Sequence, residues 1–501
     1  MVVKHQKRTM GSEMPRTTRD STERDTEDGR AARSPRRSGG RAVEELRSRH
    51  SHFVYQRYAI SHAGERLTFR SQFTTTPDLV FTPEVTIDGV SQEVLRDCPP
   101  GVLENMAFHL GLMEIPSYWK ATCAPNIVVK AAPTSGPQLE WLKDLLLQGM
   151  GEFFFVNDID FTGPEFITLR SESATGQLPR DERARSSHRV LVPLSGGKDS
   201  IVTWETLSRH GLELGTMALN PTQAAEQILV LSGCSQPIRV RRVIDSNLLQ
   251  LNARGYLNGH TPFSSYLAFL AVTCASLFGF GRVAMSNERS SDEGNVVYRG
   301  RSVNHQYSKS LDFERKFQWY AAHYLASGVE FFSFLRPLFE IQITRVFAKA
   351  IRYHAAFRSC NRGQARNAWC GSCPKCLAVY SMLFPFLDTV EVWRIFSQDL
   401  FSRPELASIA LDLLTPGNKP FECVGTREEN LVSFYLSVRK LQAQGIPLPP
   451  LLRRVHDQVL AREADLEQRA VTLLGAWSLE HAVPQDLLPL LEAETSDNGQ
   501  A

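Results

Sequence analysis

A loop with two adjacent glycines carries the clearest chemical signal in the chain. It reads Ser-Gly-Gly-Lys-Asp-Ser at residues 195–200 and follows a short apolar run at 190–194. Adjacent glycines let backbone N–H groups approach an anion closely, and a helix that starts at the loop adds the positive end of its dipole. Lys198 supplies a charge, and Asp199 is placed to help hold Mg²⁺ against phosphates. The loop therefore predicts a phosphate site.

The residue order in this loop distinguishes it from other phosphate loops. It lacks the leading glycine of G-x-x-x-x-G-K-S/T, so phosphoryl transfer of the kinase or GTPase kind fits poorly. The simpler interpretation, a Gly-Gly turn with an Asp-Ser helix cap, is disfavoured by the strand before it and the helix after it. The motif resembles the PP-loop of the N-type ATP pyrophosphatases, which implies that ATP is cleaved between its α and β phosphates to form an adenylate. The expected ATP-binding residues are Ser195, Gly196, Gly197, Lys198, Asp199 and Ser200. Of these, Lys198 and Asp199 are also expected to be catalytic.

Four cysteines gather in the short segment 360–376. Four thiolates at this spacing suit a tetrahedral Zn²⁺ ion, and the glycine after Cys370 allows a tight turn around the metal. Four inert thiols or an iron–sulfur cluster are the alternatives. The remaining cysteines, including Cys423, are scattered and are interpreted as ordinary thiols. The expected ligands of a structural zinc ion are Cys360, Cys370, Cys373 and Cys376.

A polar run at 286–310 contains more carboxylates, amides and basic groups than a spacer needs. Ligands bind at the carboxyl edge of parallel sheets, where this run is expected to lie. Acid/base catalysis is expected from Glu288, Tyr307, Lys309 and above all His305, because an unperturbed imidazole titrates near neutrality. Each of these residues also has a structural interpretation, such as a solvated charge or a satisfied surface imidazole. The expected substrate-binding residues are Asn287, Glu288, Arg289, Asn304, His305 and His260.

The elements that must position these residues alternate between strand and helix, which predicts an α/β fold with a parallel sheet. Strands are expected at 190–194, 214–219, 238–244, 282–286 and 331–335, and helices at 199–210, 222–231, 266–280, 311–326 and 341–355. The expected organisation is a disordered tail (1–50), a mixed α/β N-terminal unit (51–169), a linker or exposed loop (170–189), a PP-loop domain with the four-cysteine site (190–387), a helical C-terminal region (388–490) and a disordered end (491–501). Within the helical C-terminal region, helices are expected at 428–444 and 451–474.

Composition excludes several classes of protein. Hydrophobic residues make up 42% and charged residues 22% of the chain, as in soluble globular proteins. A formal charge of +2 gives no argument for binding nucleic acid or a membrane surface. No apolar run is long enough to span a bilayer, and no signal-peptide core follows the N-terminal charges. A cytoplasmic protein is expected, and the sequence predicts no particular protein partner.

Five motifs together resemble the bacterial UDP-N-acetylmuramoyl-L-alanyl-L-glutamate epimerases. They are the phosphate loop, Asn-Gly-His-Thr-Pro at 258–262, Ser-Asn-Glu-Arg-Ser at 286–290, Val-Asn-His-Gln-Tyr-Ser-Lys-Ser at 303–310 and Cys-Gly-Ser-Cys-Pro-Lys-Cys at 370–376. The resemblance covers about 53–387. It implies that ATP and Mg²⁺ drive inversion of the terminal L-glutamate of UDP-MurNAc-L-Ala-L-Glu, releasing AMP and pyrophosphate. The implied partner is this small-molecule substrate.

Two other functions share some of these features. A ligase similar to the deazaguanine synthases or to tRNA-modifying enzymes would share the loop and the zinc site, but the chain has no strong basic stripe for RNA. An ATP-binding sensor without turnover would keep the fold alone. The intact Lys198 and Asp199, together with the polar run, count against a sensor.

Overall fold

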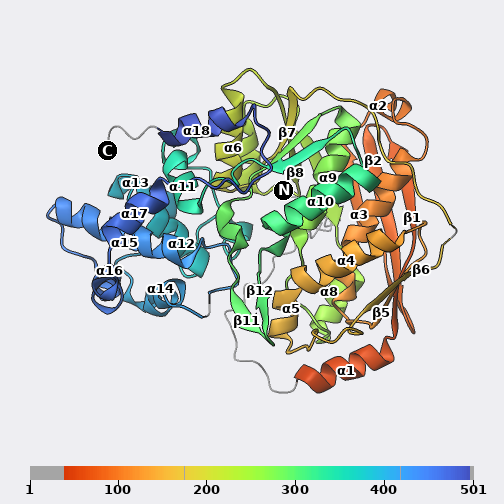
Figure 1. The fold of residues 1–501 in the computed structure, drawn as a ribbon, viewed down its shortest axis with the longest axis horizontal. Coiled ribbons are helices and arrows are strands. Elements are labelled where there is room, and N and C mark those ends of the chain that lie inside the picture. The colour runs from red at the N-terminus through yellow and green to blue at the C-terminus, as the bar shows by residue number, and fades with distance from the viewer. Residues whose placement is uncertain (1–38, 174, 418, 497–501) are drawn as a thin grey trace, which may run out of the picture.

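A single large β-sheet forms the centre of the computed structural model, which describes residues 39–173, 175–417 and 419–496 (Figure 1). The segments 1–38 and 497–501, both predicted to be disordered, lie outside the described residues. The strands are β1 (His52–Ala63), β2 (Arg66–Thr75), β3 (Leu79–Phe81), β4 (Glu84–Asp88), β5 (Asn126–Val129), β6 (Thr168–Ser171), β7 (Arg189–Pro193), β8 (Glu213–Leu219), β9 (Ile238–Val243), β10 (Arg282–Met285), β11 (Val296–Tyr298), β12 (Arg301–Val303) and β13 (Glu330–Ser333).

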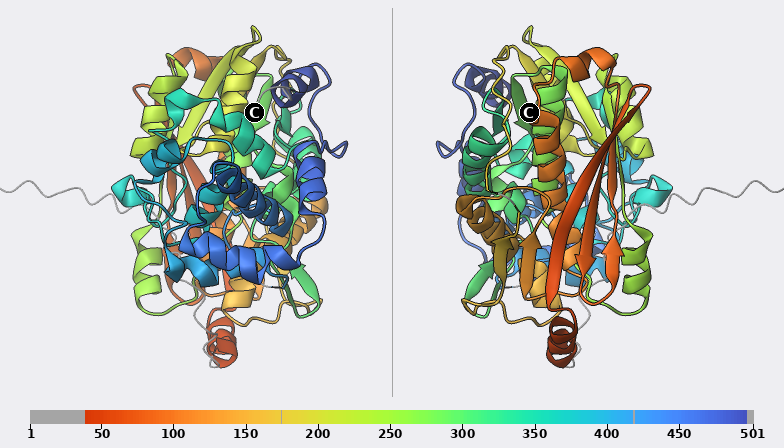
Figure 2. Two further views of the ribbon diagram at one scale, coloured as in Figure 1. Left: turned by 90° about the vertical axis from the view of Figure 1, so that its left-hand side faces the viewer. Right: turned by 90° about the vertical axis from the view of Figure 1, so that its right-hand side faces the viewer.

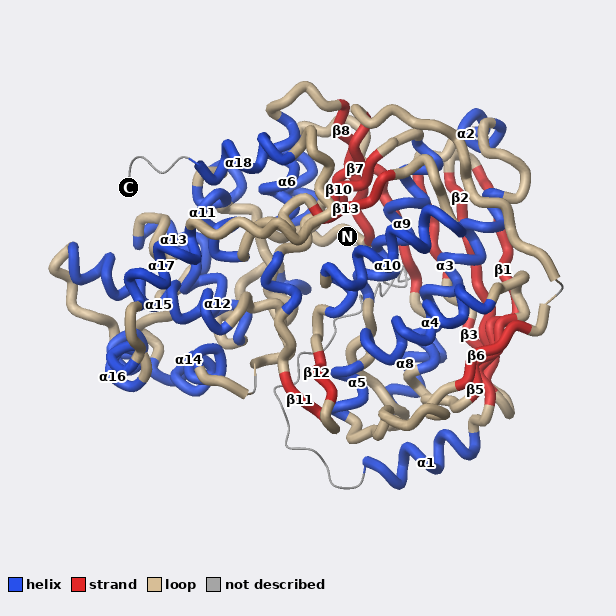
Figure 3. Tube along the Cα trace, in the orientation of Figure 1, coloured by secondary structure: helices blue, strands red, loops and turns tan. Residues whose placement is uncertain are grey.

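Helices surround the strands and form a further group at the end of the molecule away from β1 (Figure 3). They are α1 (Gly39–Arg49), α2 (Gln92–Arg96), α3 (Val102–Trp119), α4 (Gly136–Gly149), α5 (Gly151–Val156), α6 (Lys198–Ser208), α7 (Gln223–Ser232), α8 (Ser246–Ala253), α9 (Phe263–Phe278), α10 (Leu311–Tyr324), α11 (Glu340–Ala348), α12 (Pro374–Leu383), α13 (Thr389–Phe396), α14 (Ala407–Leu414), α15 (Arg427–Ala443), α16 (Pro450–Gln458), α17 (Leu466–Leu474) and α18 (Leu488–Ser496).

The large sheet has eleven strands in the order β13-β10-β7-β8-β9-β4-β2-β1-β5-β6, with β3 paired to β2. Pairing is parallel from β13 to β9 and again from β1 to β6, and antiparallel from β9 through β4 and β2 to β1. The strands of the predicted N-terminal unit (51–169) therefore continue the central sheet. The physical reason is that β4 pairs with the otherwise open edge of β9.

The two faces of the sheet belong to different cores. Along β7, Val190 and Val192 point into one core and Leu191 into the other, as alternating strand residues must. Helices α3 and α9 contact strands on the Leu191 side, while α6 contacts β7 and β10 and is itself contacted by α11. The core around Val190 continues without a break into the C-terminal helices α12 to α16. The predicted boundary at 387 therefore does not separate two cores.

Most elements predicted between 190 and 347 are confirmed. Two predicted helices, over 341–355 and 451–474, differ from the structure. The helix predicted over 341–355 ends as α11 at Ala348. The helix predicted over 451–474 is broken into α16 and α17, because Glu463 is extended and Asp465 adopts a left-handed φ of 55°. Arg427 and Arg469 hold this break by binding the two carboxylate oxygens of Glu463, at 2.7 and 2.8 Å.

Three segments predicted to be disordered or exposed are ordered at least in part. Within 1–50, α1 lies at one extremity of the molecule (Figure 2), where Arg47 donates hydrogen bonds to the carbonyls of Cys123 and Phe166. In the predicted linker, Asp181 is fully buried and binds Arg185 at 2.6 Å. At the C-terminal end, α18 continues to Ser496. Hydrogen bonds from Arg47 to backbone carbonyls in the first segment, and the Asp181–Arg185 ion pair in the second, compensate the polar composition.

Membrane insertion receives no support from the helices. Among the described residues, none of the helices has both the length and the apolar character that crossing a bilayer requires.

Candidate active site

The predicted phosphate loop joins the end of β7 to the start of α6. Gly197 is extended and caps the helix, which begins at Lys198. The loop is held by its own serines, since the Ser195 N–H donates to Ser200 Oγ at 3.2 Å and Ser200 Oγ donates to the Gly197 carbonyl. Gly196 is required here, because a Cβ would lie 2.7 Å from the Arg358 carbonyl oxygen. The geometry fits an anion site at a helix N-terminus.

Lys198 is buried and carries two ion pairs. Its Nζ lies 2.6 Å from Asp199 Oδ1 and 2.8 Å from Glu340 Oε1, the latter at the start of α11. Burial alone would lower the pKa of Lys198, but the attraction of Asp199 and Glu340 raises the pKa above its ordinary value. The lysine is therefore a fixed positive charge beside the loop.

A second group of side chains lies close to this loop, and we call it the acid–base cluster: Glu152, His260, Glu288, His305, Lys309 and Cys423. Two of its members, Glu288 and Lys309, are near enough to Asp199 for that carboxylate to shift their pKa values. The cluster joins residues from α5, from the loop before α9, from the polar run and from the segment before α15. The structure thus brings together four of the residues that the sequence predicts.

His305 is bonded on both sides. Its Nδ1 makes a short hydrogen bond with Glu152 Oε2, and a second hydrogen bond joins the ring to Cys423. Burial opposes its charge, but Cys423 and Glu152 together raise the pKa of His305 to about 10. The imidazole is therefore a cation near neutrality, which removes the reason for ranking it first as a base.

The His260 ring packs against the His305 ring at a tilt of 42°, with the ring centroids 4.2 Å apart. Burial and the neighbouring positive charge of His305 hold the pKa of His260 well below its usual range. Glu152, His260 and His305 each offer a metal-ligating atom within 4.8 Å of the others. The direct hydrogen bond between Glu152 and His305 leaves no space for an ion between those two atoms, so we assign a hydrogen-bonded pair beside a neutral imidazole.

Glu288 is a buried carboxyl, with 4% of its surface exposed. Burial raises its pKa to about 7, with Lys309 opposing this shift and Asp199 adding to it. At neutral pH the group therefore exchanges protons readily, as an acid or base in catalysis must. This finding supports its predicted role.

Four other predicted residues are bonded elsewhere. The Asn287 amide donates to Ser333 Oγ at 3.0 Å, and Asn304 bonds the backbone of its own loop. The Arg289 guanidinium lies 4.5 Å from the centroid of the Phe339 ring. The Tyr307 hydroxyl donates to Asp312 at 2.7 Å and stands in a cluster of Asp144, Asp312 and Lys316. These contacts engage the four side chains within the protein, and their predicted roles stay predictions.

Cys423 was expected to be an ordinary thiol, but the structure places it among charged groups of the acid–base cluster. Its Sγ lies 3.3 Å from Lys309 Nζ and also bonds His305. Two backbone anchors bring it there: the Asn295 amide donates to the Pro420 carbonyl at 2.7 Å, and the Lys375 N–H donates to Glu422 at 3.0 Å. The helical C-terminal region thus contributes a thiol to the cluster.

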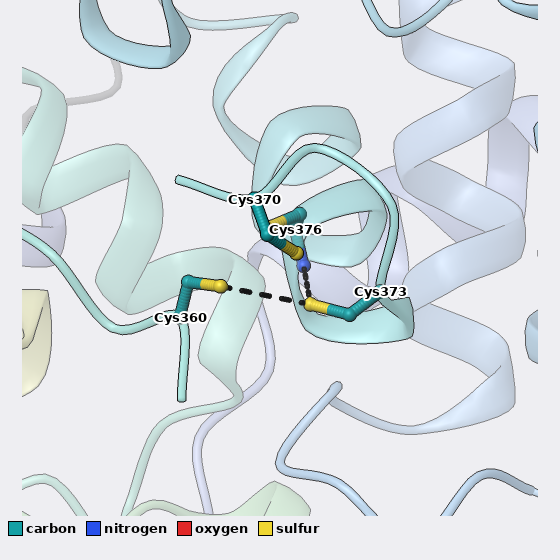
Figure 4. A group of neighbouring side chains, drawn as sticks. All are labelled: Cys360, Cys370, Cys373 and Cys376. Atoms are coloured by element: carbon teal, nitrogen blue, oxygen red, sulfur yellow. Dashed lines mark hydrogen bonds between the residues drawn. The ribbon is translucent and has the colours of Figure 1, made fainter. Parts of the chain in front are cut away.

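The four predicted metal ligands converge (Figure 4). The Sγ atoms of Cys360 and Cys373 are 3.9 Å apart, and those of Cys370 and Cys376 are 3.7 Å apart. Tetrahedral zinc with bonds of about 2.3 Å separates its sulfurs by roughly 3.8 Å, so the donor set fits that ion. Backbone N–H groups of Gly363 and Cys376 point at sulfur, as in metal-binding turns.

Sequence reasoning missed three residues of the site. Glu152 and Glu340 could have been found from the sequence, because each is a single carboxylate inside an otherwise apolar run. These runs are 149–156 and 337–341. A buried run that contains one charge needs a partner for that charge. Cys423 had no comparable signal, since its partners come from distant segments.

Comparison with known proteins identifies the family of this chain. Residues 44–334 match the family described as the MurL N-terminal domain, and residues 356–468 match the MurL C-terminal domain. The chain belongs to the MurL family. The phosphate loop and most of the acid–base cluster fall in the first MurL domain, whereas Cys423 and the four-cysteine group fall in the second.

Three similar proteins are each named UDP-N-acetyl-alpha-D-muramoyl-L-alanyl-L-glutamate epimerase. The protein from Salinispora tropica is 36% identical over 64% of this chain and 70% of its own length. The protein from Micromonospora sp. is 33% identical over 81% and 90%, and that from Xanthomonas oryzae pv. oryzae is 31% identical over 74% and 82%. No solved structure matches this chain.

The pH dependence of stability tests the state of Glu288. Its pKa is about 7 in the folded protein and 4.5 in an unfolded chain, so the folded state binds more protons between these values. The free energy of unfolding should therefore fall as pH rises from about 4.5 to 7, by up to about 3 kcal/mol. Glu288→Gln should flatten this fall in urea unfolding measured across that range. An identical pH slope in both proteins would contradict the assignment.

Proposed function

We propose that this protein is an ATP-dependent epimerase that converts the terminal L-glutamate of UDP-N-acetylmuramoyl-L-alanyl-L-glutamate to D-glutamate in peptidoglycan precursor synthesis. One observation carries the proposal: the predicted phosphate loop and a cluster of titratable groups lie within electrostatic range of each other, through Asp199, Glu288 and Lys309. The names of the three similar proteins supply the substrate. These names also favour an epimerase over a ligase or a sensor.

Activation of the substrate falls to the phosphate loop. The N-terminal N–H groups of α6 and the charge of Lys198 would bind the phosphates of ATP. Asp199, which is partly exposed, and Glu340 would hold Mg²⁺, which when bound neutralises phosphate charge. An oxygen of the glutamate α-carboxylate attacks the α-phosphorus, forming a P–O bond while pyrophosphate leaves. The product is an acyl adenylate.

Adenylation makes inversion feasible. A carboxylate suppresses loss of the neighbouring Cα proton, because the resulting enolate would carry a second negative charge next to the first. Conversion to an acyl adenylate removes that obstacle. Groups of the acid–base cluster then remove the Cα proton and return a proton to the opposite face, and water finally releases AMP. The buried cations Lys198 and Lys309 would stabilise the enolate oxygen.

A structural zinc ion is part of the proposal. Four converging thiols without a metal would repel one another once ionised, and their spacing fits tetrahedral zinc. The same turn presents the Lys375 N–H to Glu422, next to Cys423. The metal would therefore help to position the C-terminal part of the site while taking no part in the reaction.

Activity assays test the function directly. Wild-type protein with ATP, Mg²⁺ and the UDP-muramoyl dipeptide should form D-glutamate, AMP and pyrophosphate together. Lys198→Ala and Asp199→Ala should lower AMP formation by about 10²-fold or more, since charge stabilisation at the phosphates is lost. Lys130→Ala is the matched control, because Lys130 pairs with Glu172 at a surface site. ATP binding without AMP formation in the wild type would favour the sensor instead.

Metal analysis tests the four-cysteine group. Purified protein should contain one zinc ion per chain, and Cys373→Ser should lose it and unfold at a lower temperature. Cys234→Ser is the control, since Cys234 stands apart from the group and should leave the zinc content unchanged. Iron with labile sulfide would contradict the zinc assignment, and a metal-free, fully stable wild type would contradict a metal site altogether.

A further inference from the structure

The proposed reaction needs two proton carriers, and the cluster contains a thiol that no role yet uses. Cys423 is a half-buried residue on the segment that precedes α15. Its Sγ lies 3.3 Å from the Lys309 ammonium and is hydrogen-bonded to His305. It stands apart from the four-cysteine group, whose ligand atoms lie together at 360–376. Its neighbours are those of an activated thiol rather than a structural one.

Charges around the sulfur favour its ionised form. Burial alone would raise the pKa of Cys423, but the cations Lys309, Lys375 and His305 hold it well below its ordinary value. His305 remains cationic because Glu152 binds its other ring nitrogen. A thiolate beside an imidazolium is the reactive state of a cysteine, and the charges around Cys423 favour that state.

Other members of the cluster are less suited to take a proton from carbon. Lys309 is itself held as a cation, because Cys423 and Glu288 raise its pKa. His305 is committed to Glu152 and to the thiol. The remaining proton carrier with a pKa near neutrality is Glu288. Cys423 and Glu288 are two groups suited to exchange a proton, and Lys309 lies close to both.

We propose that Cys423 is a catalytic acid/base of the inversion, exchanging a proton between its sulfur and one face of the glutamate Cα, while Glu288 serves the opposite face. This role rests on the proposed function. In the step, the Cα–H bond breaks, an S–H bond forms, and the electron pair of the broken bond moves into the acyl-adenylate carbonyl. The carboxyl of Glu288 then gives its proton to Cα from the other side. Lys309 and His305 are positioning residues that keep the sulfur ionised.

Thiol reactivity tests the state of Cys423 without reference to any substrate. Iodoacetamide labelling of the holoprotein, followed site by site with mass spectrometry, should show Cys423 reacting rapidly at neutral pH and little faster at alkaline pH. Lys309→Met should slow labelling of Cys423 at neutral pH by about tenfold or more. Cys234, which is also half-buried, serves as an internal control and should be unaffected. If the labelling rate of Cys423 in the wild type rose steeply with pH, the thiolate assignment would be wrong.

Hydrogen exchange in D₂O tests the catalytic role. Cys423→Ser should slow epimerisation by about 10²- to 10⁴-fold, with a much smaller effect on AMP formation. The variant should still exchange the α-hydrogen of one epimer, the one served by Glu288, and lose exchange from the other. Exchange of the α-hydrogen from both epimers at the wild-type rate would overturn the proposal. An acyl group on Cys423 that hydroxylamine releases would also overturn it, because the sulfur would then be a nucleophile. Failure of the wild type to form AMP would instead contradict the proposed function, whatever the labelling result.

Discussion

The buried ion pair between Lys198 and Glu340 is the interaction on which the site depends. An ammonium group with almost no exposure must have a countercharge, and Glu340 supplies it at 2.8 Å from the start of α11. The same end of α11 is bound twice more, because the Glu340 N–H donates to Ser290 Oγ and the Ile341 N–H donates to Glu429 Oε1, each at 2.9 Å. The need of Lys198 for a countercharge therefore connects the phosphate loop, through the start of α11, with the polar run and with α15.

This connection explains how distant segments form one site. Glu429 also accepts the N–H of Thr426 at 2.7 Å, which fixes the chain just beyond Cys423. On the other side of Cys423, the segment is bound through Pro420 to Asn295 and through Glu422 to the four-cysteine turn. Both MurL domains therefore contribute to the site. The loop that would activate the substrate and the thiol that would move its proton are held by the same framework.

Local sequence predicted the parts of the site that are local. The phosphate loop depends on six consecutive residues, and its strand, turn and helix follow from glycine positions and apolar spacing. The four cysteines were likewise predicted and do converge, although their metal stays a prediction. The parallel strands β7 to β10 were predictable because β7, β8 and β10 are mainly apolar and β9 interleaves apolar residues with arginines. Their antiparallel link to β4 was not predictable, since register across distant strands leaves no local pattern.

Long-range partners account for what the sequence did not predict. His305 was ranked by its unperturbed pKa, but Glu152 and Cys423 change its charge state, and neither lies near it in sequence. Tyr307 was grouped with the catalytic residues by proximity along the chain, yet its hydroxyl turns toward Asp312 and Asp144. The helical C-terminal region gave no chemical signal, because one cysteine in a polar connection has no distinguishing pattern.

Oxygen transfer from substrate to nucleotide tests the central claim, the acyl adenylate, most directly. The UDP-muramoyl dipeptide would be labelled with ¹⁸O in both oxygens of the glutamate α-carboxylate, and the AMP formed in one round of reaction would be analysed by mass spectrometry. Attack of a carboxylate oxygen on the α-phosphorus predicts one ¹⁸O atom in each AMP. AMP without ¹⁸O, formed alongside D-glutamate, would contradict the account, because ATP would then be cleaved without activating the carboxylate.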